Sequence, residues 1–434
     1  MTQRFSPCPR IVIVGGGTAG LLLATRLGQQ LGRKGNAQIT LIDRSLTHLW
    51  KPMLHTIAAG TRDVHQHKVS LLAQARAQGF AYEPGELCGL SRNRRLVHLA
   101  ELPSAGDRPV VGPRAVPYDV LVLALGSGAN DFGVPGVQAH CHFIDSQAQA
   151  EAFNHRLRCQ LFRGALQDEA VTIDIVGAGA TGVELAAELS HLMEMAAHFG
   201  DPSLRERLRL TLYESAPRIL AAFPERVSES SHRVLEKLGF TIRTGTRVQA
   251  AQAQGLVTAD TPLAPNDMTV WAAGIKAPEV LSRLGGLRTN PSLQLLIDAT
   301  LRCVDDEHIF ALGDCSTLTL PDQPRPLPAS AQVAVQQATH LARHLPGWLR
   351  CSALPAFEYR DLGGLVSLGR YGAYGTVGKA GLLPGQFLGG ALARLGHGLV
   401  YRNYQRSLHG LGKTGLLWAT ESLNGWTHPG IRLG

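Results

Sequence analysis

Short apolar runs that end in glycine-rich turns recur along the chain, and the first lies close to its start. The pattern of apolar and polar positions predicts, in order, a strand over residues 11–14, a glycine turn over 15–20, a helix over 21–27, and a second strand over 39–42 that ends at Asp43. The glycines of the turn have G-x-G-x-x-G spacing. Strand, turn, helix, strand and acid in this order indicate a dinucleotide-binding unit.

Each position of this unit has a physical task. Gly15 allows a sharp turn, Gly17 lets the backbone approach a pyrophosphate, and Gly20 lets helix and strand pack closely. The N-terminus of the helix offers N–H groups and a partial positive charge to that pyrophosphate. Asp43 is placed to accept a hydrogen bond from a ribose hydroxyl. A glycine fingerprint alone would be weak evidence against an ordinary glycine-rich turn, but this full context favours nucleotide binding.

The same organisation is repeated in the middle of the chain. The pattern predicts a strand over 171–176, a second G-x-G-x-x-G turn over 177–182, a helix from Val183 to about Met195, and a strand over 208–213. That last strand is followed by an acid, as in the first unit. Two chance matches in the same context are improbable, so the sequence predicts two dinucleotide sites.

The acid of the second unit bears on the choice of nucleotide. Glu214 follows the second strand of that unit, and an acid there accepts from the 2′-hydroxyl of NADH and repels the 2′-phosphate of NADPH. Glu214 therefore favours NADH, while Arg218 nearby leaves NADPH open.

Further patterns complete the predicted organisation. They comprise a loop of bulky and basic residues (48–60), a small antiparallel sheet (80–116), buried strands (118–125, 268–273 and 309–312), a linker (133–136), a helix (329–345), a proline-containing connection (346–362) and a C-terminal unit.

Composition limits the possible functions. The chain has 434 residues, enough for two or three domains, and a net charge of +8. The chain has no long basic run and no zinc-finger spacing, so nothing in it indicates nucleic-acid binding. A basic surface would also suit binding to an anionic membrane. The seven cysteines include no C-x-x-C pair, which favours reduced thiols in a cytosolic setting, and the seventeen histidines lack metal-ligand spacing. The sequence contains no run of 18 apolar residues, so it predicts no membrane-spanning helix.

The two fingerprints and the Gly-Asp pair at Asp314 resemble the flavoproteins with two dinucleotide-binding domains. Within that class the chain is most similar to the type II NADH dehydrogenases, the single-chain, non-pumping NADH:quinone oxidoreductases. The matching stretches are His48–Gly60, Ile175–Leu189, Tyr213–Leu220, Thr269–Pro278, Thr300–Cys315, Ala331–Gln336, Leu365–Leu368 and Leu408–Leu417.

The resemblance implies an α/β fold with two Rossmann-type domains and a C-terminal amphipathic membrane-binding segment. The FAD-binding domain would be split over residues 1–150 and 295–345, the NADH-binding domain would be inserted as 151–294, and the segment 346–434 would associate with the membrane. The implied reaction passes a hydride from NADH to FAD and then two electrons to a membrane quinone, without proton pumping. The expected location is peripheral, at the cytoplasmic face of the inner or plasma membrane, on anionic lipid and as a possible homodimer.

The site residues follow from the fingerprints and the resemblance together. For FAD they are Gly15, Gly16, Gly17, Thr18, Ala19, Gly20, Asp43, Arg44, Lys51, Asp314, Ala331 and Gln332; for NADH they are Gly177, Gly179, Ala180, Thr181, Gly182, Glu214, Ala273 and Gly274; the expected catalytic residues are Glu184, Gln332 and Gln336.

Four of these positions have a plain alternative. Gln332 and Gln336 lie one helical turn apart, where neutral amides could bind quinone carbonyls or could simply be solvated. Glu184 would relay protons or position the nicotinamide, as the resemblance suggests, or would only complement the N-terminus of its helix. Lys51 would reach the flavin or be a solvated loop cation.

The C-terminal unit has an amphipathic pattern. It predicts helices whose apolar stripe is formed by Leu388, Leu392, Leu395 and Leu399. A cationic face is formed by Arg402, Arg406, His409 and Lys413, and a second apolar face by Val400, Tyr404 and Leu411. Trp418 and Trp426 are available at a membrane interface. The alternative is an ordinary helix packed on the body of the protein. The need to reach a quinone in the bilayer favours the membrane anchor.

Two other functions stay open at this point. A flavoprotein reductase of this architecture could serve a soluble electron carrier, although such an enzyme does not need the amphipathic unit. A poorly active NADH- and FAD-binding sensor or assembly protein is the second alternative. It is left open by three departures from the family pattern, Thr56, Ala329 and Ser330.

Overall fold

The computed structural model describes residues 8–102, 111–199, 207–321, 323–379 and 385–427. The chain divides into two compact units, each built from separate segments. The first unit comprises Met1–Lys51, His67–Gly128 and Ile275–Tyr359, and the second comprises Pro52–Gln66, Ala129–Gly274 and Arg360–Gly434.

The first unit is built on a parallel sheet. Its described strands are β1 (Arg10–Val14), β2 (Gln38–Asp43), β5 (Ala81–Pro84), β9 (Val120–Leu123) and β20 (Ile309–Ala311). They lie in the order β20-β9-β1-β2-β5, and every neighbouring pair is parallel. Because all the carboxyl ends lie at one edge, the turns after β1, β2, β9 and β20 come together there. The central strands are continuous apolar runs, as expected where both faces are covered.

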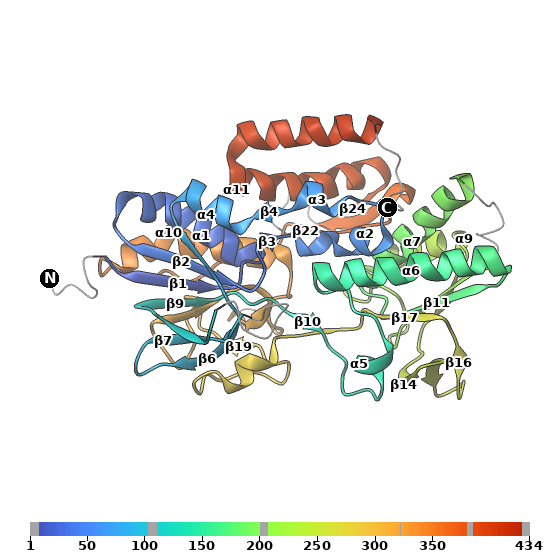
Figure 1. Ribbon diagram of the computed structural model, residues 1–434, viewed down its shortest axis with the longest axis horizontal. Coiled ribbons are helices and arrows are strands. Elements are labelled where there is room, and N and C mark those ends of the chain that lie inside the picture. Colours follow the sequence, from blue (N-terminus) through green and yellow to red (C-terminus); the bar gives the residue numbers. More distant parts are fainter. Residues whose placement is uncertain (1–7, 103–110, 200–206, 322, 380–384, 428–434) are drawn as a thin grey trace. The chain divides into compact units, whose positions relative to one another are not determined.

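Helices and small sheets surround that parallel sheet. Helix α1 packs against α10 and α4, and Figure 1 shows α1 in blue and α10 in orange. The bounds are α1 (Thr18–Gln30), η1 (Gly32–Lys34), η2 (Lys51–Met53), α4 (Leu71–Gln78), η3 (Glu279–Arg283), η4 (Gly313–Cys315) and α10 (Ala331–Trp348), with strands β3 (Thr47–His48), β4 (Val69–Ser70), β6 (Leu87–Ser91), β7 (Leu96–Leu99), β8 (Arg114–Pro117), β19 (Leu295–Leu296) and β21 (Ser316–Thr317).

The second unit repeats the parallel architecture. Strands β11 (Val171–Val176), β12 (Leu208–Tyr213), β13 (Phe240–Arg243) and β17 (Met268–Trp271) lie in the order β13-β12-β11-β17, all parallel. Its remaining described elements before residue 360 are α2 (Leu54–Ala59), α5 (Val137–His140), α6 (Gln147–Gln167), α7 (Ala180–Phe199), α9 (Glu225–Lys237), β14 (Val248–Gln252), β15 (Gly255–Thr258) and β16 (Ala264–Pro265). Helix α3 (Val64–His67) and strands β10 (Gly128–Ala129) and β18 (Ile275–Lys276) lie where the chain passes between the units.

The C-terminal part of the second unit is an antiparallel sheet followed by a bent helix. The sheet contains β22 (Gly363–Ser367), β23 (Ala373–Val377) and β24 (Phe387–Gly389), and η5 (Gly369–Tyr371) lies between the first two. Helix α11 (Gly390–Thr427) is interrupted at Gly410, whose φ of 80° is not helical. Figure 1 shows its two halves, in red, folded back on each other as a hairpin.

Several predicted elements differ from the structure. The segment 48–60, predicted as a loop, contains α2, whose residues are all buried. Of the predicted antiparallel sheet over 80–116, β5 instead pairs in parallel with β2. The C-terminal apolar stripe does not begin on a helix, because Leu388 lies in β24. The division into FAD-binding and NADH-binding domains at 150 and 294 stays a prediction.

Candidate functional site

The first glycine turn separates positions needed for packing from one that faces open space. A Cβ atom on Gly20 would lie 1.9 Å from the carbonyl oxygen of Gly15, and one on Gly15 would lie 2.3 Å from that of Ala124. Gly15 also has a φ of +106°, which L side chains rarely adopt. No described atom lies within 4 Å of a Cβ on Gly17. The chain therefore leaves room for a ligand at the start of α1.

The N-terminus of α1 has the features that an anionic ligand needs. Gly17 is the N-cap and offers no side chain to cap the first N–H groups. Thr18 is half-buried, and Ala19 is buried. The cradle fits the pyrophosphate of a dinucleotide, because free N–H groups and the helix dipole both favour negative charge.

Asp43 ties the end of β2 to the glycine turn. One of its carboxylate oxygens accepts from the N–H of Gly16, and the other accepts from the N–H of Ser45 at 2.7 Å. The ring of His48 lies 2.8 Å from the carbonyl oxygen of Gly16. Neighbouring Arg44 pairs with Glu86 at 3.1 Å on the exposed surface. Asp43 is thus fixed beside the turn, where a carboxylate can bind ribose.

A second polar chain lies at the same edge of this sheet. Lys51 Nζ donates to the carbonyl oxygen of Ser127 at 2.6 Å, and the Ser127 hydroxyl donates to Asp314 at 2.8 Å. Asp314 follows β20, and the N–H of neighbouring Gly313 donates to Gln337 at 2.7 Å. The structure therefore links Lys51 and Asp314 through one serine, a link that was not predicted from the sequence.

Helix α10 brings three glutamines to the first unit, each with different surroundings. Gln337 is buried and holds Gly313, as described above. Gln332 accepts from the hydroxyl of Tyr359 at 2.9 Å, and both it and Gln336 are half-buried. Ala331 is the first residue of the helix. The half-burial of both side chains favours a site role for Gln332 and Gln336 over full solvation, and their contact with quinone stays a prediction.

The second glycine turn repeats the geometry of the first. A Cβ on Gly182 would lie 1.9 Å from the carbonyl oxygen of Gly177, and one on Gly177 would lie 2.6 Å from the N atom of Ala273. Among the described residues nothing lies within 4 Å of a Cβ on Gly179. Ala180, which begins α7, is half-buried, and Thr181 is exposed. The open side of this turn again fits a pyrophosphate.

Glu214 and Arg218 have separate environments in the second unit. Glu214 accepts from the N–H groups of Ala178 and Ala216, each at 2.8 Å, which matches the position of Asp43 in the first unit. Arg218 donates to three carbonyl oxygens, those of Leu220 at 3.2 Å, Ala221 at 3.0 Å and Phe223 at 2.8 Å. Its guanidinium is thus committed to holding the following loop.

The turn after β17 lies beside this second glycine turn. Ala273 packs against the buried cluster that contains Val176 and Trp271. Gly274 has a φ of +58°, and a Cβ there would lie 2.4 Å from the ring of Phe132. Any larger residue at 274 would therefore disturb Phe132 as well as the backbone.

A buried polar cluster surrounds Glu184, the fifth residue of α7. Its Oε1 accepts from the N–H of Ser367 at 3.0 Å. His55 Nδ1 lies 3.5 Å from Oε2, and His397 Nε2 lies 3.9 Å from Oε1. Burial raises the pKa of Glu184 to about 8, against the lowering effect of the Ser367 N–H. At neutral pH the carboxyl therefore holds its proton.

The histidines of this cluster are neutral. Burial lowers the pKa of His55 to about 3, helped by His397 and Arg62, and burial with Arg62 also lowers the pKa of His397. His55 lies in α2, which the sequence pattern presents as a loop, and His397 lies in α11. The only sequence signal for a role of His55 was its position in the stretch 48–60 that matches the family. No sequence signal pointed to His397.

Helix α11 exposes a set of large apolar side chains on both of its halves. They are Leu395, Leu399, Val400, Leu411, Leu416, Leu417, Trp418 and Leu423. Tyr404 is buried, so the predicted face of Val400, Tyr404 and Leu411 is divided between core and surface. The side chains of Leu392 and Trp426 lie outside the described residues.

The predicted cationic face of α11 is also only partly exposed. Arg402 pairs with Glu421, which joins the two halves of the hairpin, and Arg62 pairs with the same carboxylate at 3.3 Å. His409 is half-buried, and its pKa is lowered by burial and by Lys413. Arg406 and Lys413 are exposed. The predicted face therefore mixes a structural ion pair with solvent-facing charges.

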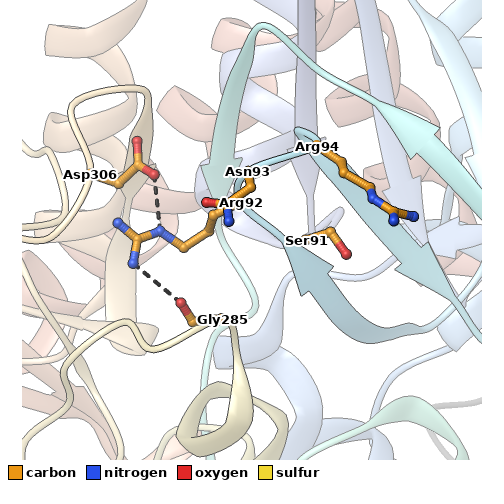
Figure 2. A pocket seen from close by; sticks show the side chains of 6 residues that line it. All are labelled: Ser91, Arg92, Asn93, Arg94, Gly285 and Asp306. Atoms are coloured by element: carbon orange, nitrogen blue, oxygen red, sulfur yellow. Dashed lines mark hydrogen bonds and ion pairs between the residues drawn. The ribbon is translucent and has the colours of Figure 1, made fainter.

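A pocket of about 590 Å³ lies elsewhere in the first unit, as Figure 2 shows. It is lined by Ser91, Arg92, Asn93, Arg94, Gly285 and Asp306. The guanidinium of Arg92 donates to Asp306 at 3.0 Å and to the carbonyl oxygen of Gly285 at 3.2 Å. Arg92 thus links the lining residues Asp306 and Gly285 to each other.

The described parts of the chain contain neither a cluster of metal-binding side chains nor a helix that could span a membrane. No group of three or more histidine, cysteine or acidic side chains there could hold a metal ion. No helix in those parts is long and apolar enough to cross a membrane.

Comparison with known proteins places this geometry in a family. Residues 9–338 match the model of the pyridine nucleotide-disulphide oxidoreductases. A type II NADH:quinone oxidoreductase of Haemophilus influenzae is 37% identical over 98% of this chain and 99% of its own. One from Staphylococcus saprophyticus is 27% identical, over 85% of this chain and 89% of its own.

Solved structures show the same fold. NDH2 from Plasmodium falciparum in complex with NADH matches with a TM-score of 0.82 at 16% identity, over 98% of this chain and all of that one. The sulfide:quinone oxidoreductase of Aquifex aeolicus matches with a TM-score of 0.73 at 17% identity, over 93% of this chain and 92% of its own. At these identities the likeness concerns the fold alone.

The predicted α/β class, the FAD and NADH cofactors and the enzyme class are thereby confirmed. The two glycine turns fit the two dinucleotides, FAD and NADH. The family match over almost the whole chain supports quinone as the electron acceptor. A reductase of a soluble carrier is not supported. The chain belongs to the type II NADH:quinone oxidoreductases, flavoproteins that oxidise NADH through FAD and reduce quinone.

Proposed function

We propose that the enzyme works on a membrane surface without pumping protons, with FAD bound at the first glycine turn and NADH at the second. The observation that carries this assignment is the duplicated cradle: an open-sided glycine turn whose neighbouring acid, Asp43 or Glu214, is fixed by backbone N–H groups. When bound, FAD accepts the hydride of NADH and passes two electrons to the quinone.

The residues of each cradle have distinct tasks in this proposal. Gly15, Gly20, Gly177 and Gly182 allow the tight approach of backbone to backbone, as their Cβ distances indicate. The N–H groups that follow Gly17 and Gly179 bind pyrophosphate. Asp43 and Glu214 bind ribose hydroxyls. Because Arg218 is committed to three carbonyl oxygens, Glu214 sets the preference for NADH over NADPH.

Three side chains are proposed to act at the acceptor side. Gln332 and Gln336 donate amide hydrogen bonds to the quinone carbonyls. Glu184 relays the proton that quinone reduction needs, which is supported by its burial and its raised pKa. Lys51 and Asp314, joined through Ser127, orient the flavin side of the first unit.

Anaerobic rapid mixing tests the reaction as two separate half-reactions. NADH should bleach the flavin absorption of the purified protein, and a short-chain quinone should then restore it. A bleached flavin that no quinone restores would contradict the acceptor and favour a sensor. Gln336→Ala should slow only the second half-reaction, and Glu214→Ala only the first. Glu229→Ala, an exposed acid of α9, is the matched control for Glu214.

The membrane surface is assigned to α11. Its exposed Leu411, Leu416 and Trp418 would enter the interface, and exposed Arg406 and Lys413 would attract anionic lipid. Because the enzyme pumps no protons in this proposal, it needs no path through the bilayer. It lies peripherally on the cytoplasmic face and takes quinone from the lipid.

Vesicle sedimentation tests the role of the hairpin. Replacing Leu411, Leu416 and Trp418 by serine should reduce binding of the full-length protein to anionic vesicles, with activity toward a soluble quinone retained. Serine at Leu72 and Leu362, which are exposed elsewhere on the protein, is the matched control. Equal binding of the hairpin variant and the wild type would reject the anchor.

The proposal also includes a homodimer. Phe162 and Leu166 lie one turn apart on α6 and are both exposed, which supports a further contact surface there. Sedimentation equilibrium of detergent-solubilised protein measures the oligomeric state, and a single monomeric species at all concentrations would exclude the dimer.

A further inference from the structure

The surroundings of Glu184 contain a second polar layer that the reaction described so far does not use. Three separate elements meet its carboxyl: α2 through His55, β22 through the N–H of Ser367, and α11 through His397. All three belong to the same compact unit as Glu184. Each carboxylate oxygen thus faces one histidine.

The members of this cluster differ in their access to water. The side chains of His55 and Glu184 are 6% and 11% exposed, whereas that of His397 is 31% exposed. Of the two histidines beside the buried carboxyl, His397 is therefore the one that offers a proton a short route from solvent.

We propose that His397 is the proton entry point of the enzyme, which passes protons from solvent to Glu184, while His55 positions the carboxyl from its other side. This inference rests on the proposed role of Glu184 as proton relay. It gives the C-terminal hairpin a second task, because the helix assigned to the membrane surface then also supplies protons to the reaction.

The proton balance of the reaction requires such a path. Oxidation of NADH by a quinone follows NADH + H⁺ + quinone → NAD⁺ + quinol. The hydride supplies two electrons and one proton, so one more proton must come from water in each turnover. In the proposed step, Glu184 first gives up its carboxyl proton. His397 Nε2 then binds a proton from water and passes it to Oε1 of Glu184.

The distances suit a relay with a small movement. His397 Nε2 lies 3.9 Å from Oε1, longer than a hydrogen bond, so transfer needs a slight approach or one bridging water. His397 is neutral because burial and Arg62 lower its pKa, and it is therefore free to accept a proton. The carboxyl of Glu184 is the stored acid, with a pKa of about 8.

Other charged groups around the cluster set its electrostatics. Glu188 lies on the same helix and raises the pKa of Glu184, while it accepts a hydrogen bond from Thr61. Arg62 lowers the pKa of both histidines. Helix α7 also carries His191, which Glu188, Arg370 and Glu194 influence. Among the described residues, the charged groups that act on Glu184, His55 or His397 are Glu188 and Arg62.

The test separates proton supply from flavin reduction. In His397→Phe holoenzyme, NADH should bleach the flavin at the wild-type rate, and restoration by a short-chain quinone should slow at least about tenfold, as for loss of a proton-transfer group. Its solvent deuterium isotope effect should rise, and added imidazole should restore the rate of His397→Ala, whose smaller side chain leaves room for it. His232→Phe is the control, since that side chain is 32% exposed and lies 3.4 Å from Glu236.

Two further variants make every outcome decisive. His397→Gln keeps a polar side chain that cannot carry a proton, so it should be slow even if the phenylalanine variant folds poorly. In a Glu184→Gln background, His397→Phe should cause no additional slowing, because the relay is already broken.

The failure of this inference is distinguishable from the failure of the proposed function. If Glu184→Gln restores the flavin at the wild-type rate, the relay role of Glu184 is rejected. If Glu184→Gln is slow but both His397→Phe and His397→Gln match the wild type, or if imidazole does not rescue His397→Ala, only the entry point is rejected.

Discussion

At the scale of single residues, the glycines of the first turn fall into two kinds. Gly20 is enclosed, because its Cβ would meet a backbone oxygen at 1.9 Å, whereas Gly17 faces open space. Sequence spacing marks both as glycines but cannot separate them. Steric fit assigns Gly20 to folding and Gly17 to the ligand.

This difference predicts two distinct phenotypes for the same substitution. Gly20→Ala should destabilise the protein by about 1–3 kcal/mol, since the added methyl group overpacks a backbone contact, and FAD content should fall with it. Gly17→Ala should keep the melting temperature of the FAD-free protein while weakening FAD binding. Thermal melts and flavin titration check both. An unchanged melting temperature for Gly20→Ala would contradict the packing argument.

The buried carboxyl of Glu184 predicts a pH dependence of stability. Its pKa of about 8 lies above the ordinary 4.5, so between these values the folded state binds more protons than the unfolded state, and stability falls as pH rises. The lowered pKa of His55, about 3, acts below pH 6.5 with the opposite sign. The interval between pH 6.5 and 8 therefore isolates Glu184.

Glu184→Gln should accordingly lose less stability than the wild type between pH 6.5 and 8. One proton is worth at most about 1.4 kcal/mol per pH unit, so the difference should be on the order of 2 kcal/mol. Denaturant unfolding at the two pH values measures it, with Glu229→Gln as a control on the exposed surface. Parallel pH curves for the two proteins would show that the carboxyl is already ionised.

At the scale of elements, the N-terminus of α10 explains one departure from the family pattern. Ser330 is one of the three departures, and its hydroxyl accepts from the N–H of Val333 at 3.3 Å as the N-cap. The replacement thus supplies a good cap for the helix that carries Gln332 and Gln336.

Ser330→Ala should therefore cost about 1 kcal/mol of stability. It should also slow quinone reduction more than flavin reduction by NADH, because the first turn of α10 carries Gln332. Melting curves and the two half-reactions measure these effects. Ser330→Asp, which keeps an acceptor at the cap, should behave as the wild type; a loss equal to that of the alanine variant would show that the cap is not the cause.

At the scale of the whole molecule, the net charge of +8 and the exposed basic residues of α11 predict salt-sensitive binding to lipid. Each basic residue near an anionic surface contributes on the order of 1 kcal/mol, and salt screens that attraction. Binding to anionic vesicles should decrease steeply as sodium chloride is raised, while binding to zwitterionic vesicles should be weak throughout. Sedimentation at several salt concentrations checks this, and salt-independent binding would assign the attachment to apolar contacts alone.

The sequence by itself determined the two glycine cradles, their acids and the strand and helix that flank each cradle. These features depend on local sterics and on short apolar runs that end in glycine turns, and both are set by consecutive residues. The likeness of nearly the whole chain to one family followed from the same short stretches, and the relatives confirm it.

Only the tertiary structure decided which distant side chains meet. His55 and His397 flank Glu184 because α2 and α11 pack around α7 and its neighbours, and no local pattern records that contact. The same holds for α11, where Tyr404 is buried and Leu411 is exposed although both fit one apolar stripe. Helical periodicity names a face, but only packing decides whether protein or solvent covers it.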